Sequence, residues 1–171
     1  VKGIMGDNKI RNTIHGLLSS GTQTAGNVFS QVNLATDLIQ KTIRLEVEKY
    51  RTHFKDSNEG FIKNWPNDYT LYGWVVSMQN GGQLAPHMHD RGWLSGSIYI
   101  NVPPKLKSDS GNLVVCIDNE KYETKGRKNQ KESIDVVTGS LCLFPASLLH
   151  YTIPFESEEE RVVLAFDVVP K

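Results

Sequence analysis

Hydrophobic and polar positions divide the chain into a helical first part and a stranded second part. Between Asn27 and Tyr50, apolar residues recur at steps of three and four positions, which is the spacing of an amphipathic helix. These apolar residues are Val28, Val32, Ala35, Leu38, Ile39, Ile43, Leu45 and Val47. We expect this face to pack against the rest of the protein and the charged face to lie in solvent.

Beyond Asp68 the pattern changes to short runs of β-branched and aromatic residues that are separated by turn-forming residues. The glycine pair Gly81–Gly82 is expected to break the first strand, Tyr69–Gln79, before a strand that carries two histidines. The later strands are expected at Leu94–Asn101, Leu113–Asp118, Ser133–Val137, Ser140–Phe144, His150–Phe155 and Arg161–Val168, with a charged loop over Asp118–Lys131. Strands this short and this frequent indicate a β-sandwich or a β-barrel.

Length and composition are those of one globular domain. A chain of 171 residues with 39% hydrophobic content can bury a core without disulfides or structural metals. We therefore expect a single domain over residues 1–171, with helical or irregular support in 1–68 and the β core in 69–171. Cys116 and Cys142 lie in apolar runs and are expected to be unpaired core thiols.

Charge and hydropathy exclude several classes of partner. The 19 basic and 19 acidic residues cancel, so nothing favours binding to nucleic acid or to an anionic membrane. No run approaches the ~20 apolar residues of a membrane span, and no signal segment is visible, so we expect a soluble, cytoplasmic protein. Its specificity must come from a defined site.

The candidate site begins with His87 and His89. Side chains two residues apart on a strand point to the same face, so these two imidazoles could hold one metal ion. This spacing alone is a moderate signal, because many such pairs bind nothing. His150 lies on a late strand, which in an antiparallel jelly roll can lie beside an early one and supply a third ligand. His15 has no partner at ligand spacing, and we predict no role for it.

The strand Leu94–Asn101 indicates a polar pocket beside these histidines. Ser95, Ser97, Tyr99 and Asn101 alternate with small or apolar residues, so one face of the strand is polar.

Three segments in order, PHMHDRGWLSGSIYINVP, GSLCLFPASLLH and RVVLAFDVVP, resemble the iron(II)- and 2-oxoglutarate-dependent oxygenases, including those fused to tetratricopeptide repeats. The resemblance implies a mainly β fold, a double-stranded β-helix of the jelly-roll or cupin type, with the N-terminal helix packed on the major sheet. It implies Fe(II) as cofactor and 2-oxoglutarate and molecular oxygen as cosubstrates. The substrate would be a small molecule or a peptide, hydroxylated with release of succinate and CO2.

Residue by residue, the resemblance makes His87 and His150 metal ligands and Arg161 the anchor of the distal carboxylate of 2-oxoglutarate. An arginine suits this role because its planar fork of donors matches a carboxylate. Many oxygenases of this kind also carry a serine two residues after the arginine, where this chain has Val163. Ser95, Ser97 or Tyr99 could supply the missing contact.

The ligand motif departs from the usual pattern of two histidines and one carboxylate, because the second position holds His89 rather than an acid. His89 could coordinate the metal, Asp90 could replace it if the strand bulges, or water, chloride or substrate could fill the position. Strand parity favours His89. Two other functions stay open: a cupin-type three-histidine metalloenzyme that does not use 2-oxoglutarate, and a non-catalytic binding module on the same fold. A buried arginine at position 161 favours the oxygenase.

Overall fold

The structure is a computed structural model, and it describes residues 12, 13, 15–31, 33–116 and 130–171. The loop predicted over Asp118–Lys131 lies outside the described residues except for its last two positions. In chain order the elements are β1 (Asn12–Thr13), β2 (Leu18–Thr24), η1 (Val28–Ser30), α2 (Leu34–His53), α3 (Gly60–Lys63), β3 (Tyr69–His87), β4 (Leu94–Asn101), β5 (Leu113–Cys116), β6 (Lys131–Ile134), β7 (Leu141–Pro145), β8 (Leu149–Thr152) and β9 (Arg161–Pro170).

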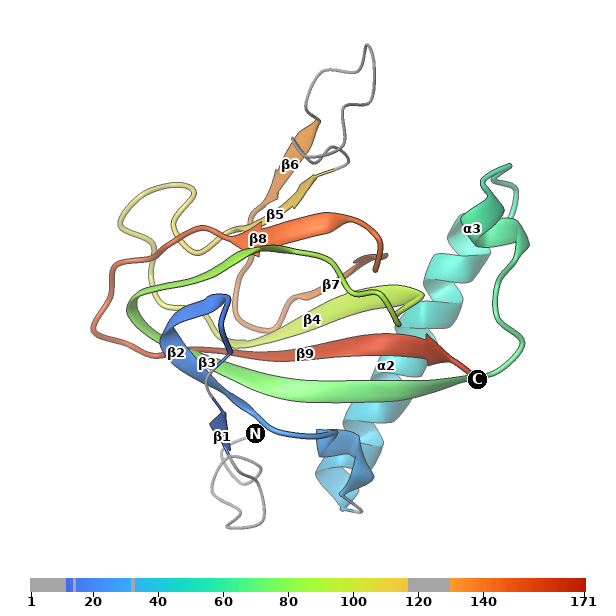
Figure 1. The fold of residues 1–171 in the computed structure, drawn as a ribbon, viewed down its shortest axis with the longest axis horizontal. Helices are drawn as coiled ribbons and strands as arrows, with labels where there is room; N and C mark the ends of the chain where they lie inside the picture. The colour runs from blue at the N-terminus through green and yellow to red at the C-terminus, as the bar shows by residue number, and fades with distance from the viewer. Residues whose placement is uncertain (1–11, 14, 32, 117–129) are drawn as a thin grey trace.

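The strands form one curled antiparallel sheet in the order β6-β5-β8-β3-β9-β4-β7, with β2 paired to β3 and β1 to β2. Strand β3 joins the two layers, because it pairs with β9 from Tyr69 to Met78 and with β8 from Leu84 to His87. Figure 1 shows β3 bending back so that its last part runs beside β8. The mainly β, jelly-roll fold expected from the sequence is therefore confirmed.

The predicted break at Gly81–Gly82 is a bend within one strand rather than an end. Gly81 has φ 74°, a backbone conformation that favours glycine, and its N–H donates to the carbonyl of Phe155 at 2.8 Å. The glycine pair therefore changes the pairing partner of β3 while the strand continues to His87.

Helix α2 begins at Leu34, so the prediction of a helix from Asn27 was wrong in its first two turns. Asn33 caps the helix by accepting from the Thr36 N–H, and the Thr36 hydroxyl oxygen accepts in return from the Asn33 N–H. Residues Val28–Ser30 form a separate 3-10 turn that is capped by Asn27. Two capping asparagines thus divide one apolar pattern between two elements.

The buried face of α2 was also predicted only in part. Ile43 and Val47 are fully buried, whereas Leu38 and Leu45 are 54% and 64% exposed. Leu45 follows Ile43 by two residues, which turns it about 200° around the helix and away from the sheet. Because apolar residues lie on both sides of the helix, the sequence alone did not show which side packs against the sheet.

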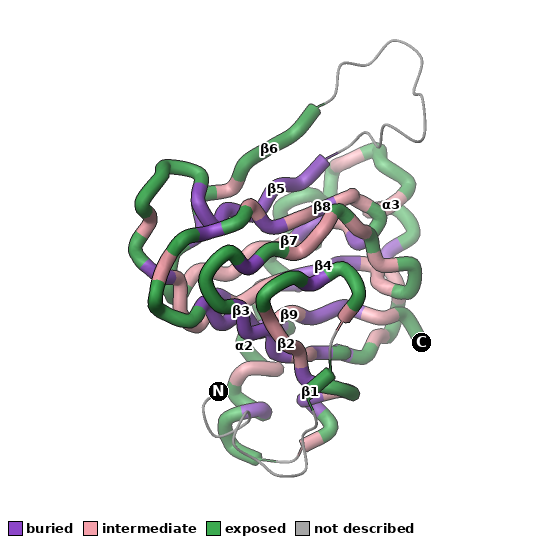
Figure 2. Tube along the Cα trace, turned by 60° about the vertical axis from the view of Figure 1, so that its left-hand side comes forward, coloured by how far each residue is buried: buried purple, intermediate pink, exposed green. Residues whose placement is uncertain are grey.

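Helix α2 lies on the outer face of the sheet made by β3, β9 and β4 (Figure 1). Its residues pack in one cluster with apolar side chains of these strands, among them Leu71, Val75, Leu164 and Phe166. The prediction that this helix packs on the major sheet is confirmed. Figure 2 shows buried stretches along β5, β4 and β9.

Strand β2 was not predicted, because its sequence LSSGTQT is polar and contains a glycine. It pairs with β3 between Val76 and Leu84. Cys116 and Cys142 are free, as expected. Among the described residues, no helix combines the length and the apolar character that crossing a membrane requires.

Candidate metal centre

The three predicted histidines converge on one point. His87 ends β3 and lies directly opposite His150 of β8, with ring centroids 4.2 Å apart. His89 lies two residues past the end of β3, and its ring is 5.1 Å from that of His87 and 5.0 Å from that of His150. The three histidines each offer one ligand nitrogen, and these nitrogens lie within 4.8 Å of one another, a group that could hold a metal ion.

Backbone carbonyl groups fix the tautomers of His87 and His150. The Nδ1 atom of His87 lies 2.8 Å from the carbonyl oxygen of Ala85, and Nδ1 of His150 lies 3.0 Å from that of Leu148. A carbonyl oxygen only accepts, so each Nδ1 carries the proton and each Nε2 keeps its lone pair. Both rings are therefore prepared to bind a metal through Nε2.

His89 is oriented differently, by a carboxylate. Its Nδ1 lies 2.7 Å from Oδ1 of Asp167, and the hydroxyl of Ser95 donates to the same oxygen at 2.7 Å. An ionised carboxylate only accepts, so Nδ1 of His89 is also the protonated nitrogen. Sequence reasoning missed Asp167, although a single acid inside the apolar run of β9 was a signal, because a buried acid needs a partner.

Burial keeps the paired histidines neutral. Desolvation lowers the pKa of His150 to about 4, and the nearby imidazole of His87 acts in the same direction. Desolvation is also the largest cause of the lowered pKa of His87. Neutral imidazoles are the form that binds metals, so no proton has to leave these two rings first.

Asp90, the predicted alternative to His89, lies away from the histidine group. Its side chain is exposed and lines a neighbouring hollow with Tyr72 and Arg91, not the cavity that His87 and His150 line. The structure therefore brings His89, and not Asp90, to His87 and His150. His15, for which we predicted no role, lies at the turn before β2 and lines the same cavity as the three histidines.

The histidines open into a cavity of about 230 Å³ inside the curled sheet. Ser95, Ser97 and Tyr99 line it from β4, as the alternation along that strand predicted. Arg161 also lines it, from the first position of β9. One cavity is therefore lined both by the three histidines and by a guanidinium.

Arg161 is only 2% exposed, yet no carboxylate among the described residues pairs with it. Its Nη2 donates to the carbonyl of Gly111 at 3.2 Å, and its Nε has no hydrogen-bond partner among the described residues. Burial lowers the pKa of the guanidinium. The guanidinium carbon lies 5.3 Å from the ring centroid of Tyr99. A buried cation without a counterion is costly, so this end of the cavity is suited to receive an anion.

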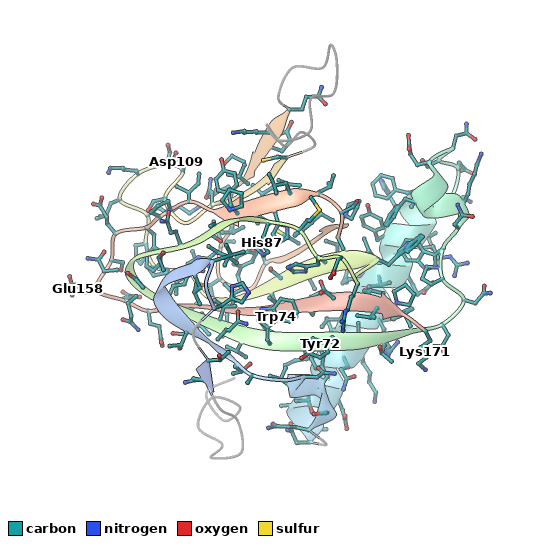
Figure 3. All side chains as sticks on the ribbon, in the orientation of Figure 1. Tyr72, Trp74, His87, Asp109, Glu158 and Lys171 are labelled. Carbon is teal, nitrogen blue, oxygen red and sulfur yellow. The ribbon has the colours of Figure 1, made fainter. Side chains whose placement is uncertain are left out.

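A second hollow of about 470 Å³ adjoins the first on the other side of His89. Tyr72, Trp74 and Met88 form its apolar wall, and Trp74, Met88 and His89 line both spaces. Figure 3 shows Tyr72 and Trp74 along β3, with His87 on the part of the strand that returns beside β8. The ring of Trp74 lies 5.5 Å from that of His89, so the wall of this second hollow reaches the histidine cluster.

A family model described as "Putative 2OG-Fe(II) oxygenase" matches residues 72–167, which are more than half of the chain. This range contains Arg161 and the three histidines of the candidate metal centre. The chain belongs to this oxygenase family. Membership implies Fe(II) as the cofactor and 2-oxoglutarate as the cosubstrate of the site. No match was found among curated protein sequences.

Solved structures of similar fold include other oxygenases. A Pseudomonas putida prolyl-4-hydroxylase has a TM-score of 0.62 and 12% identity, over 99% of this chain and 82% of that chain. A 2OG-Fe(II) oxygenase family oxidoreductase from Burkholderia pseudomallei has a TM-score of 0.58 and 12% identity, over 98% and 76%. HygX from Streptomyces hygroscopicus, with nickel and 2-oxoglutarate bound, has a TM-score of 0.58 and 11% identity, over 99% and 78%. At these identities the likeness shows that this chain shares their fold.

Proposed function

We propose that this protein is an Fe(II)- and 2-oxoglutarate-dependent oxygenase that hydroxylates a small molecule or a peptide and releases succinate and CO2. The observation that carries the proposal is that one cavity is lined by three histidines that could hold a metal ion and by a buried guanidinium that has no carboxylate partner among the described residues. The first group fits a divalent metal and the second fits the far carboxylate of a dicarboxylic acid.

His87, His89 and His150 would hold the iron through Nε2. Their Nδ1 protons are all engaged, by Ala85, Asp167 and Leu148, so the rings cannot rotate without losing a hydrogen bond. Three ligands on one side of a metal leave positions for a chelating cosubstrate and for oxygen. The donor set therefore fits iron even though it lacks the usual carboxylate.

Arg161 would bind the distal carboxylate of 2-oxoglutarate. Tyr99 can assist, because burial raises the pKa of its phenol and keeps the proton available for donation. The hydroxyl of Ser95 is already engaged by Asp167, so Ser97 and Tyr99 are the predicted hydroxyls that remain to replace the serine absent at Val163.

Iron and 2-oxoglutarate, when bound, would supply oxygen activation coupled to decarboxylation of the cosubstrate. The chain positions the two groups and keeps water from the cavity with apolar walls such as Phe144 and Val163. The substrate would lie in the second hollow against Tyr72 and Trp74, with its reacting carbon close to His89.

Succinate formation from 2-oxoglutarate in the presence of Fe(II) tests this proposal. The wild-type chain is expected to form succinate slowly without added substrate, Arg161→Gln to form almost none, and Arg161→Lys to retain part of the activity. Arg51→Gln, at an exposed position of α2, is the matched control and should match the wild type. Equal rates in Arg161→Gln and the wild type would contradict the role of Arg161.

The alternative of a cupin-type metalloenzyme rests on the same three histidines, since such a site needs no carboxylate ligand. That enzyme would bind iron but would not respond to 2-oxoglutarate. A non-catalytic binding module would bind no metal. Metal affinity and 2-oxoglutarate affinity, measured separately, therefore distinguish the three functions.

A further inference from the structure

Asp167 makes the three histidines unequal. Its Oδ1 accepts hydrogen bonds from His89 Nδ1 and from the Ser95 hydroxyl, both at 2.7 Å, and Ser95 Oγ lies 2.9 Å from His89 Nδ1. Residue Asp167 is 9% exposed, and no lysine or arginine among the described residues pairs with its carboxylate. Its negative charge is therefore directed at one imidazole of the cluster.

The other two imidazoles are hydrogen-bonded to uncharged groups. His87 and His150 each donate Nδ1–H to a backbone carbonyl oxygen. A carboxylate behind a ligating imidazole raises the basicity of the ring and strengthens its bond to the metal more than a carbonyl does. His89 thus occupies the motif position where an acid is usual, and it is also the histidine with an acid behind it.

We propose that Asp167 is a positioning residue that supplies, through His89, the negative charge that the H-x-H motif lacks as a direct ligand. The inference rests on the proposed function, because it presumes a divalent metal on the three histidines. The carboxylate is not a ligand itself in this arrangement, because the described residues that could hold a metal together are the three histidines. Asp167 instead acts on the metal through the imidazole of His89.

Several contacts hold the carboxylate in this place. Asp167 is directly opposite Ser95 in the pairing of β4 with β9. A Cβ on Gly92 would lie 3.2 Å from Cγ of Asp167 and 2.9 Å from Cβ of Ala146, so the absence of a side chain at Gly92 leaves room for the acid. The N–H of His89 donates to the carbonyl of Ala146 at 3.0 Å, which fixes the backbone of the ligand. The triangle of Asp167, Ser95 and His89 is therefore built from three separate segments.

The effect of the charge can be separated from that of the hydrogen bond. Asp167→Asn keeps an oxygen that can accept from His89 but removes the negative charge. Co(II) serves as the probe metal because its binding can be followed without turnover. A merely structural role of Asp167 would weaken the site as a whole, whereas loss of charge should weaken cation binding and strengthen anion binding.

The experiment measures two affinities on the intact chain: that of the metal-free protein for Co(II), and that of the Co(II)-loaded protein for azide. In Asp167→Asn we expect Co(II) affinity to fall by ~10–100-fold, the typical cost of losing an outer-shell partner. Azide should bind more tightly, on the order of fivefold, because the cobalt centre carries one more net positive charge. Asp56→Asn makes the same change at an exposed position after α2, so both of its affinities should match those of the wild type.

Unchanged affinities in Asp167→Asn, or a fall in both, would overturn the inference and leave the proposed function standing. Failure of the wild-type chain to bind Co(II) would overturn the metal centre itself, and with it both proposals. If Asp167→Asn does not fold, Gly92→Ala is the second variant, because its Cβ would lie 3.2 Å from Cγ of Asp167, a tight contact that should shift the carboxylate relative to His89. It is expected to change the two affinities in the same directions, and unchanged values would count against the inference.

Discussion

His87 and His150 lie directly opposite each other in the antiparallel pairing of β3 with β8, and each donates Nδ1–H to the carbonyl two residues before it. The register of two strands therefore sets the separation of the two rings, and the local backbone sets their tautomer. A shift of one residue in this register would turn one ring to the opposite face of the sheet. Two of the three candidate metal ligands are in this sense positioned by the sheet.

The first prediction concerns these paired ligands. His87→Ala and His150→Ala should each weaken Co(II) binding by more than the ~10–100-fold typical of losing an outer-shell partner, because each removes a proposed direct ligand. Isothermal titration of the metal-free protein measures this. His53→Ala is the control, since this histidine lies exposed in the last turn of α2. Wild-type affinity in either ligand variant would rule out the three-histidine centre.

The second prediction compares two residues of α2 that the sequence pattern treats alike. Ile43→Ala should lower the free energy of unfolding by about 2–5 kcal/mol, because Ile43 is fully buried against the sheet. Leu45→Ala should change it by no more than about 0.5 kcal/mol, because Leu45 is 64% exposed. Urea unfolding measures both. Similar losses in the two variants would show that the outer face of α2 is covered in solution.

These two residues also show where sequence reasoning reaches its limit. Period-two alternation has a single interpretation, and it predicted Leu94–Asn101 with the observed bounds and with Ser95, Ser97 and Tyr99 in the cavity. A helix with apolar residues on both sides has no single interpretation, since only the sheet decides which side is buried. Strand β2 escaped prediction because pairing with β3, rather than an apolar pattern, makes it a strand.

The sequence predicted those residues of the candidate site that stand in a recognisable stretch of the chain. The three histidines and Arg161 stand in recognisable segments, and the fold brings them to one cavity. Asp167 was missed because its role depends on lying opposite Ser95 across two strands, a relationship that only the register reveals. His89 also lies past the end of the strand, so contact with Asp167, rather than strand parity, fixes its direction.

The third prediction concerns the close approach of β4 to β9. A Cβ on Gly96 would overlap the ring of Phe166 and lie 2.9 Å from the carbonyl oxygen of Cys142. Gly96→Ala should therefore lower the free energy of unfolding by about 1–3 kcal/mol, as overpacking of a core does. Thermal or urea unfolding measures the loss. Gly16→Ala is the control, because nothing lies within 4 Å of its added Cβ. Equal stability of the two variants would mean that the strands separate at little cost.

The most direct test of the central claim is an anaerobic titration of the metal-free protein, first with Fe(II) and then with 2-oxoglutarate, followed by visible absorption. The account predicts a weak charge-transfer band that appears only when both are present. The band should be lost in His87→Ala and weakened in Arg161→Gln, at equal protein concentration. Iron binding without a band would contradict the account and favour the cupin-type enzyme, and the absence of iron binding would favour a binding module.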